Sequence, residues 1–187
     1  MKIIYLHGFA SIGSGEKSAA MIAEFGVDNV IAPDLPFDAD EVEHTLTAII
    51  GGLKSYPIIL VGTSLGGFWA NYMAQRWDIP CILINPSMSP SVSMKHRIGT
   101  QCNYYTGDEI VVTEENVQKF IKREQYLAKN TNGALIHLFV AKDDAVLNPA
   151  DMIAAVPYFA SRTIKETGGH RFEGNWPEVI QKIKEIV

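Results

Sequence analysis

One serine in this sequence stands where a nucleophile could be presented, in the pentapeptide Gly62-Thr63-Ser64-Leu65-Gly66. The apolar run 58–61 comes directly before it and predicts a strand, while the residues after it predict a helix. A side chain at either glycine would collide as the chain reverses from strand into helix, so the pattern indicates a very sharp turn. Such a turn exposes the Ser64 hydroxyl at the end of the strand, where the N–H groups of a helix N-terminus point at the same space.

A serine hydroxyl needs a base within hydrogen-bond reach, and the base needs an acid that fixes its tautomer. The sequence supplies both after later predicted strands, in the order serine, acid, histidine. The run 135–140 is followed by Ala141-Lys142-Asp143-Asp144, and the run 162–166 by Thr167-Gly168-Gly169-His170. We therefore expect Ser64, one of the two aspartates and His170 to meet at one edge of a sheet.

Only one of Asp143 and Asp144 can face His170, because adjacent side chains in extended chain point in opposite directions. We favour Asp144 as the acid, because the acid in such a serine, histidine and acid arrangement is often followed by a short apolar stretch, which residues 145–147 supply. Asp143 then has a loop or capping role. The alternative assignment, with Asp143 as the acid, stays open at this point.

Five histidines compete for the role of base. His137 lies inside an apolar strand, His44 in a helical segment and His96 in a basic turn, and His7 opens the turn after the first predicted strand. His170 follows two glycines, which allow a close and mobile approach to the serine. The sequence therefore favours His170 as the base, against a loop histidine that caps the last helix.

The remaining requirement is a pair of N–H donors for the negative charge that develops on a substrate oxygen. One is expected from the backbone of Leu65, directly after the serine, and the other from Phe9 in the turn His7-Gly8-Phe9. Gly8 lets this turn approach the serine closely. We therefore predict that Phe9 and Leu65 form an oxyanion hole through their backbone N–H groups.

A glycine-rich stretch, Gly13-Ser14-Gly15-Glu16-Lys17-Ser18, is similar at first sight to a phosphate-binding loop. That loop requires lysine and serine directly after its last glycine, whereas here Glu16 separates Gly15 from Lys17. The glutamate would put a carboxylate where phosphate must lie. A loop that leads into a helix, with Glu16 in its first turn, is the favoured interpretation, and a nucleotide-hydrolysing enzyme or kinase is disfavoured.

The elements that must position these groups alternate along the chain, which is typical of parallel βα units. Predicted strands cover residues 2–6, 29–32, 58–62, 81–84, 135–140 and 162–166. Predicted helices cover residues 16–25, 39–53, 65–77, 114–129, 149–159 and 177–186. The long connection 86–112 interrupts this alternation, and we expect it to form a small cap over the site. A surface excursion without a role in the site is the alternative.

Length and composition agree with one domain over residues 1–187, since 47% hydrophobic and 20% charged residues are ordinary for a globular protein. A net charge of -5 gives no reason to expect nucleic acid as a partner. We find no segment that resembles a membrane span or signal peptide. Cys81 and Cys102 have no ligand-like spacing, so we expect a cytoplasmic protein without a metal.

In its ordered motifs the chain resembles the small bacterial α/β-hydrolases of the YqiA-like esterase family, over essentially its whole length. The motifs are His7-Gly8-Phe9, Pro33-Asp34-Leu35-Pro36, Gly62-Thr63-Ser64-Leu65-Gly66-Gly67, Asn85-Pro86, Asp144-Ala145-Val146-Leu147 and Gly169-His170-Arg171-Phe172. The resemblance implies the α/β-hydrolase fold, with three αβα layers, a mostly parallel sheet of about six strands, and the second strand outside the first. It also implies ester or thioester substrates. Arg171 departs from the family, in which a small residue is frequent there, and would narrow or charge the entrance.

The expected function is a serine esterase or thioesterase that hydrolyses small acyl esters or thioesters through an acyl-enzyme, with Ser64, Asp144 and His170 catalytic and no cofactor. A catalytically silent binding protein of the same fold is the alternative. Apolar cap residues predict an acyl pocket: Met88, Met94, Tyr104 and Tyr105. The basic cluster 95–97 could meet the phosphates of coenzyme A, although a solvated turn is the favoured interpretation.

Overall fold

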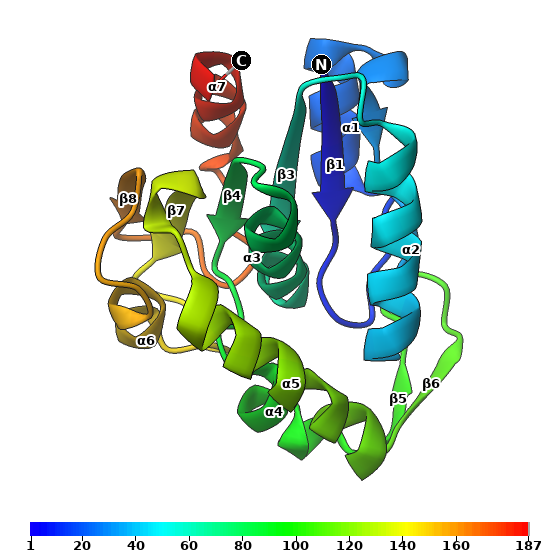
Figure 1. Ribbon diagram of the computed structural model, residues 1–187. Helices are drawn as coiled ribbons and strands as arrows, with labels where there is room; N and C mark the ends of the chain where they lie inside the picture. Colours follow the sequence, from blue (N-terminus) through cyan, green and yellow to red (C-terminus); the bar gives the residue numbers. More distant parts are fainter. Residues whose placement is uncertain (187) are drawn as a thin grey trace.

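A six-stranded sheet forms the centre of the computed structural model, which describes residues 1–186 (Figure 1). The strands lie in the order β2-β1-β3-β4-β7-β8, and each neighbouring pair is parallel. Their bounds are β1 Lys2–Leu6, β2 Val30–Ile31, β3 Ile58–Thr63, β4 Cys81–Ile84, β7 Ile136–Ala141 and β8 Ser161–Lys165. The second strand lies outside the first, as the resemblance implied.

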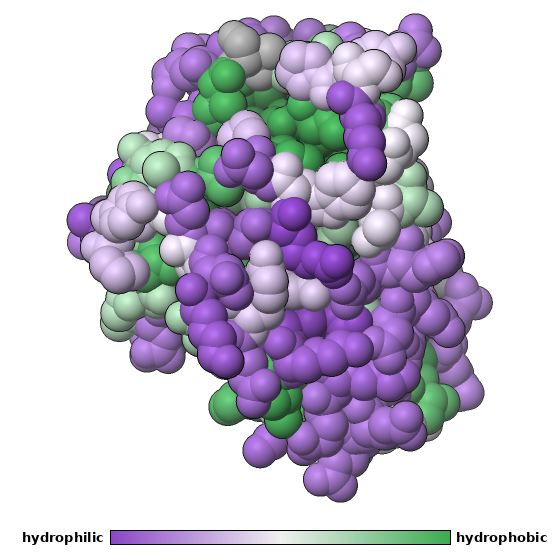
Figure 2. Space-filling model, viewed as in Figure 1, coloured by the Kyte–Doolittle hydropathy of each residue, from purple (hydrophilic) through white to green (hydrophobic). Residues whose placement is uncertain are grey.

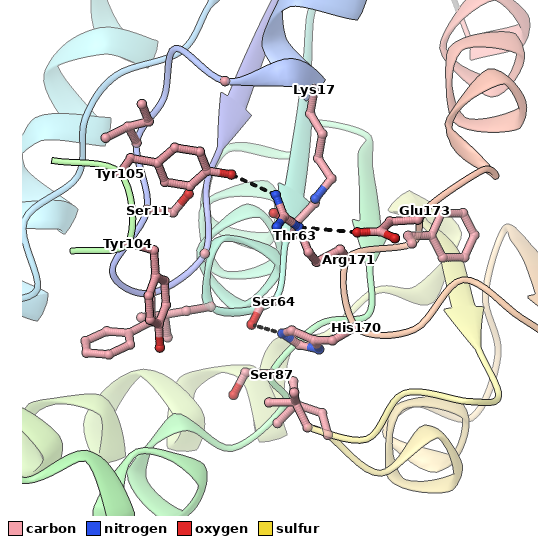
Figure 3. Close-up of a pocket in the computed structure, with 18 of the residues that line it drawn as sticks. Ser11, Lys17, Thr63, Ser64, Ser87, Tyr104, Tyr105, His170, Arg171 and Glu173 are labelled. Carbon is pink, nitrogen blue, oxygen red and sulfur yellow. Dashed lines mark hydrogen bonds and ion pairs between the residues drawn. The ribbon is translucent and has the colours of Figure 1, made fainter. Parts of the chain in front are cut away.

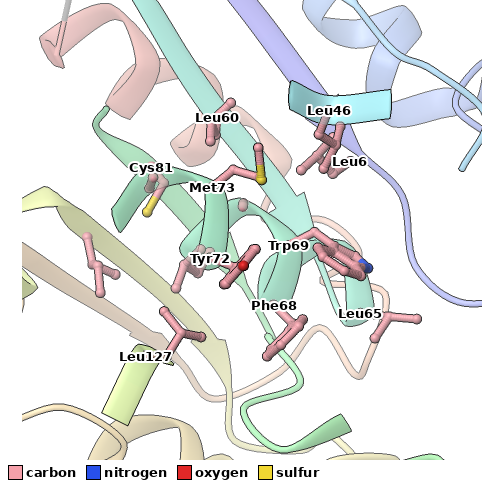
Figure 4. Packing of buried hydrophobic residues seen from close by; sticks show 14 of the residues in the cluster. Leu6, Leu46, Leu60, Leu65, Phe68, Trp69, Tyr72, Met73, Cys81 and Leu127 are labelled. Atoms are coloured by element: carbon pink, nitrogen blue, oxygen red, sulfur yellow. The ribbon is translucent and has the colours of Figure 1, made fainter. Parts of the chain in front are cut away.

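Helices cover both faces of this sheet, because successive strand residues bury their side chains on opposite sides. Ile4 and Leu6 pack with residues of α2, α3, α5 and α6, whereas Ile3 and Tyr5 pack with residues of α1 and α7. Figure 4 shows the first of these cores, in which α3 packs on the sheet. The bounds are α1 Glu16–Phe25, α2 Ala39–Gly52, α3 Leu65–Trp77, α5 Glu114–Asn130, α6 Pro149–Ala154 and α7 Trp176–Ile186.

The predicted strands and helices are all present, and most of their ends agree within two residues. The prediction of one helix over 149–159 was wrong at its end, because α6 stops at Ala154. The physical reason is Pro157, which cannot donate a helical hydrogen bond and disfavours helical backbone at the residue before it. Short 3₁₀ turns complete the connections at Val27–Asn29, Lys95–Arg97 and Gly133–Leu135.

The long connection 86–112 contains a short helix and a hairpin that the sequence did not predict. The helix α4 spans Pro90–Ser93, and β5 (Gly99–Cys102) pairs with β6 (Glu109–Val112) in antiparallel fashion. The tip of the hairpin docks on the loop after β1, where the Tyr104 N–H donates to the Ala10 carbonyl at 2.9 Å. The amide of Asn103 donates to the Ser11 carbonyl at 3.0 Å. This connection is therefore held against the loop that contains Phe9.

A buried arginine joins α2 to α5 on the outer layer. The Arg123 side chain is 1% exposed, and its Nη2 lies 2.8 Å from Asp40 Oδ1 and 2.5 Å from Glu43 Oε2. Its guanidinium also lies over the ring of Trp69, 5.5 Å from the centroid. The outer side of α5 is largely hydrophilic (Figure 2). Within residues 1–186, no helix is long and apolar enough to pass through a lipid bilayer.

Candidate active site

The turn from β3 into α3 holds Ser64 in a strained conformation, with φ 54° and ψ -120°. Close packing around the turn explains the two glycines beside it. A Cβ at Gly62 would lie 2.1 Å from the Gly66 carbonyl oxygen, and one at Gly66 would lie 2.1 Å from the Leu6 carbonyl oxygen. Only glycine fits at either position, so β1, β3 and α3 pack closely enough to fix the turn. Ser64 is thereby presented at the carboxyl edge of the sheet.

A continuous chain of hydrogen bonds joins Ser64, His170 and Asp144 (Figure 3 shows the first of them). The Ser64 Oγ lies 2.9 Å from His170 Nε2, and His170 Nδ1 lies 2.8 Å from Asp144 Oδ2. Since an ionised carboxylate can only accept, Nδ1 carries the proton and donates to Asp144. Nε2 is then left with a lone pair that accepts from the Ser64 hydroxyl.

The environment of Asp144 favours the ionised carboxylate. Its side chain is 0% exposed, and Oδ1 accepts from the N–H groups of Val146 at 2.8 Å and Leu147 at 3.0 Å. Burial raises the pKa of Asp144, but the hydrogen bonds from His170 and from these two N–H groups outweigh it and lower the pKa below its usual value. A fixed negative charge therefore lies behind the imidazole.

Asp143 faces the backbone of the histidine loop and not the imidazole. Its carboxylate accepts from the N–H of Gly169 at 2.7 Å and from that of Gly168 at 3.2 Å. The structure thus gives the two adjacent aspartates different positions, with Asp144 against the ring and Asp143 supporting the loop that carries His170. This arrangement corresponds to the favoured one of the two sequence alternatives.

Asn85 also orders this loop, a role that the sequence analysis did not predict. The side chain is 0% exposed, and the residue has φ 41° directly after β4. Its Nδ2 donates to the carbonyls of Gly169 at 2.9 Å and His170 at 3.1 Å, while Oδ1 accepts from the Ala141 N–H at 2.9 Å. Asn85 therefore ties the end of β7 to the histidine loop. The only sequence signal was the pair Asn85-Pro86 among the family motifs.

The two expected oxyanion donors lie beside Ser64. A Cβ on Gly8 would stand 3.3 Å from Ser64 Cβ, so the turn that carries Phe9 lies directly against the serine. In the described part of the chain, neither the Phe9 N–H nor the Leu65 N–H donates to a protein acceptor. Both groups are therefore available to an oxygen atom bound next to Ser64.

The other four histidines have different surroundings. His7 is buried, with Nδ1 2.8 Å from the Gly8 carbonyl oxygen and Nε2 accepting from the Leu35 N–H at 2.9 Å. Burial lowers the pKa of His7 and favours its neutral ring, which holds the turn in place through these two contacts. His137 pairs with Ser161 on the sheet, and the side chains at positions 44 and 96 are exposed.

A cavity of about 880 Å³ opens in front of Ser64 and His170. Seven of its lining residues come from the connection 86–112: Ser87, Ser93, Met94, His96, Arg97, Tyr104 and Tyr105. Two residues that the sequence associated with substrate, Met88 and Lys95, do not line it. Both apolar and charged side chains line the cavity, so it suits a ligand with apolar and polar parts.

The glycine-rich loop before α1 does not form a phosphate cradle. The N–H of Gly13 donates to Asp34 Oδ1 at 2.7 Å, and the N–H of Gly15 donates to Ser18 Oγ at 3.0 Å. These donors are already used within the protein. Within residues 1–186, no three His, Cys, Asp or Glu side chains are grouped so that they could hold a metal ion.

Several solved structures are similar to this protein over nearly its whole length. The monoacylglycerol lipase of Paleococcus ferrophilus superposes with a TM-score of 0.68 at 16% identity, over 98% of this chain and 92% of the lipase. The esterase domain of a Rhodothermus marinus protein gives a TM-score of 0.66 at 15% identity, over 99% and 85% of the two chains. At these identities the likeness establishes the α/β-hydrolase fold.

Sequence comparison identifies the family. A UPF0227 protein of Serratia proteamaculans is 26% identical over 194 residues, which cover 97% of this chain and 96% of that protein. The family model described as "Uncharacterised protein family (UPF0227)" matches residues 2–187. The chain with the Ser64, His170 and Asp144 arrangement therefore belongs to the UPF0227 family.

Proposed function

We propose that this protein is a serine hydrolase that cleaves small carboxylic esters or thioesters through an acyl-enzyme. The observation that carries the proposal is the unbroken series of contacts from Ser64 through His170 to the buried Asp144, at the wall of an 880 Å³ cavity. A binding site alone has no physical need for a serine, an imidazole and a carboxylate in this order.

In the proposed first step, the Ser64 oxygen attacks the substrate carbonyl carbon while His170 Nε2 takes the hydroxyl proton. The negative charge of Asp144 stabilises the imidazolium that forms. The carbonyl oxygen becomes an oxyanion and accepts from the N–H groups of Phe9 and Leu65. Each such donor typically lowers the barrier by about 3 kcal/mol. The close packing around the turn at Gly62 and Gly66 holds Ser64 in place for this attack.

In the second step, His170 gives its proton to the departing alcohol or thiol, which leaves the acyl group on Ser64. A water molecule then takes the place of the leaving group, and His170 removes its proton as it attacks the acyl carbon. The same oxyanion donors stabilise the second tetrahedral intermediate. Collapse of that intermediate releases the acid and returns the proton to Ser64.

The names of the similar proteins support ester chemistry, since one is a monoacylglycerol lipase and another an esterase domain. Because the fold alone hosts many activities, these names support the reaction class and say nothing of the substrate of this chain. We also propose a cytoplasmic location, because Cys81 and Cys102 are both free, as is usual in a reducing compartment. Fractionation of cells tests this location directly.

The alternative, a silent binding protein of the same fold, makes a different prediction for covalent labelling. A fluorophosphonate probe reacts with an activated serine, so we expect it to label the wild type and not Ser64→Ala or His170→Ala. The two variants serve as each other's control, because one removes the labelled atom and the other only its base. A folded wild-type protein that takes up no label would favour the binding protein.

A further inference from the structure

Two cationic side chains line the cavity beside Ser64, and the reaction proposed above makes no use of them. Lys17 comes from the first turn of α1, and Arg171 directly follows His170. Figure 3 shows the two side chains together on one side of the Ser64–His170 pair, with Ser87 on the other side. They come from opposite ends of the chain, so only the fold brings them together.

The protein provides Lys17 with little counter-charge. Among residues 1–186, no carboxylate lies within ion-pair distance of its Nζ, which lies instead near the Trp176 ring, 5.9 Å from the centroid. Burial, and then the charge of Arg171, lower the pKa of Lys17 to about 8, although Glu16 and Glu173 act in the opposite sense. An ammonium group in such surroundings is stabilised by an added negative charge.

Arg171 is positioned but only partly neutralised. Its Nη2 donates to the hydroxyl of Tyr105 at 2.9 Å, which fixes the guanidinium against the hairpin tip. Its Nε lies 3.7 Å from Glu173 Oε1, a pair in which the side chains are 61% and 74% exposed. Such an exposed pair is weak, so Arg171 retains donors for a ligand.

The other side of the cavity carries apolar side chains around a pair of serine hydroxyls. The Ser87 hydroxyl lies 2.8 Å from Ser93 Oγ, and Met94 follows in the chain. Phe9 packs in the same small cluster as Met94, and Leu147 also lines the cavity. A ligand that fills the cavity across Ser64 therefore meets Lys17 and Arg171 on one side and Phe9, Met94 and Leu147 on the other, where Arg97 lies over the Phe9 ring, 6.0 Å from its centroid.

We propose that the substrates are esters or thioesters with an anionic group, a carboxylate or a phosphate, that Lys17 and Arg171 bind on one side of Ser64, while an apolar part fills the other side. This substrate class rests on the proposed hydrolase function. The shared chemistry is an anionic oxygen group, because ammonium and guanidinium groups bind carboxylate and phosphate alike.

Two matched pairs of substrates separate the two anions. The carboxylate pair is 4-nitrophenyl hexanoate and the 4-nitrophenyl monoester of adipic acid, which have acyl chains of equal length. The phosphate pair is hexanoyl-N-acetylcysteamine and hexanoyl-coenzyme A. For at least one pair we expect the wild type to prefer the anionic member in kcat/KM by about tenfold, as a charged hydrogen bond would give. The pair that shows the preference identifies the anion.

The variant Lys17→Met removes the charge and keeps the length of the side chain. We expect it to lose the preference for the anionic member while it hydrolyses the neutral member as the wild type does. Lys54→Met is the matched control, because Lys54 also lies over a tryptophan ring, 5.1 Å from the centroid of Trp77, but does not line the cavity. It should keep the full preference.

A binding measurement keeps this proposal separate from the proposed reaction. We expect adipate or inorganic phosphate to raise the melting temperature of the wild type and of Ser64→Ala, but not that of Lys17→Met. Hydrolysis of neutral esters with equal anionic-to-neutral ratios in wild type and Lys17→Met would overturn the anion site alone. Absence of any ester hydrolysis would reject the reaction, and the melting shifts would then decide the anion site by themselves.

Discussion

Replacement of Asp144 by asparagine changes the proton positions of the site and leaves its shape almost intact. The amide oxygen can still accept from the N–H groups of Val146 and Leu147, as Oδ1 does now at 2.8 and 3.0 Å. The amide NH₂ then faces His170 Nδ1, which must accept from it in place of donating. The imidazole proton moves to Nε2, so the ring can no longer take the proton of Ser64.

We expect Asp144→Asn to lower kcat/KM by about 10⁴, the loss typical of a wrong histidine tautomer, or about 5.5 kcal/mol of transition-state stabilisation. The assay is hydrolysis of 4-nitrophenyl butyrate at pH 7. Thermal melting followed by circular dichroism would show that the variant is folded.

Asp143→Asn is the matched control for this substitution. It makes the same chemical change one residue away, where the side chain accepts from the loop N–H groups of Gly168 and Gly169. The amide oxygen can still accept there, so we expect a loss of less than about tenfold. Equal losses in the two variants, or a loss below tenfold in Asp144→Asn, would refute the reasoning.

Three further predictions follow from individual contacts. Asn85→Ala leaves the Ala141 N–H and two loop carbonyls without partners, so we expect about 3 kcal/mol less stability in urea unfolding; a change below about 0.5 kcal/mol would contradict this. Arg123→Ala should lower the free energy of unfolding in urea by about 2 kcal/mol, and Arg123→Met should lower it less, because methionine restores the packing on Trp69. Equal losses in the two variants would mean that only the charge of Arg123 matters for stability. The preference for anionic esters should fall as the pH rises through about 8, because Lys17 then loses its proton in surroundings that also hold Arg171, Glu16 and Glu173. The ratio of anionic to neutral ester hydrolysis in Lys17→Met should be flat over the same range, and a parallel decline in that variant would assign the titration to another group.

The central sheet was predictable because its strands are buried on both faces and read as continuous apolar runs. Runs such as Ile58–Thr63 and Cys81–Ile84 carry that signal within a few residues. The hairpin β5–β6 carries no such signal, since most of its residues are exposed and its pairing depends on docking against the loop after β1. The early end of α6 could have been read from Pro157.

The site was predictable where strand ends determine position, and not where distant segments meet. Ser64, Asp144 and His170 each follow a strand of one parallel sheet, so their order in the chain predicts a common edge. Asn85 acts through loop carbonyls 84 and 85 residues away, and Lys17 lines the same cavity as Arg171, which lies near the other end of the chain. Neither contact has a local pattern, because both depend on how loops pack after the sheet has formed.

The most direct test of the central claim is to observe the acyl group on Ser64. The protein would be mixed with excess 4-nitrophenyl butyrate, quenched in acid within the first turnover, and analysed by peptide mass spectrometry. The proposed reaction predicts a butyryl group on the peptide that contains Ser64 in the wild type, and none on this peptide in Ser64→Ala. Turnover without any acyl group at Ser64, or an unchanged rate in Ser64→Ala, would contradict it.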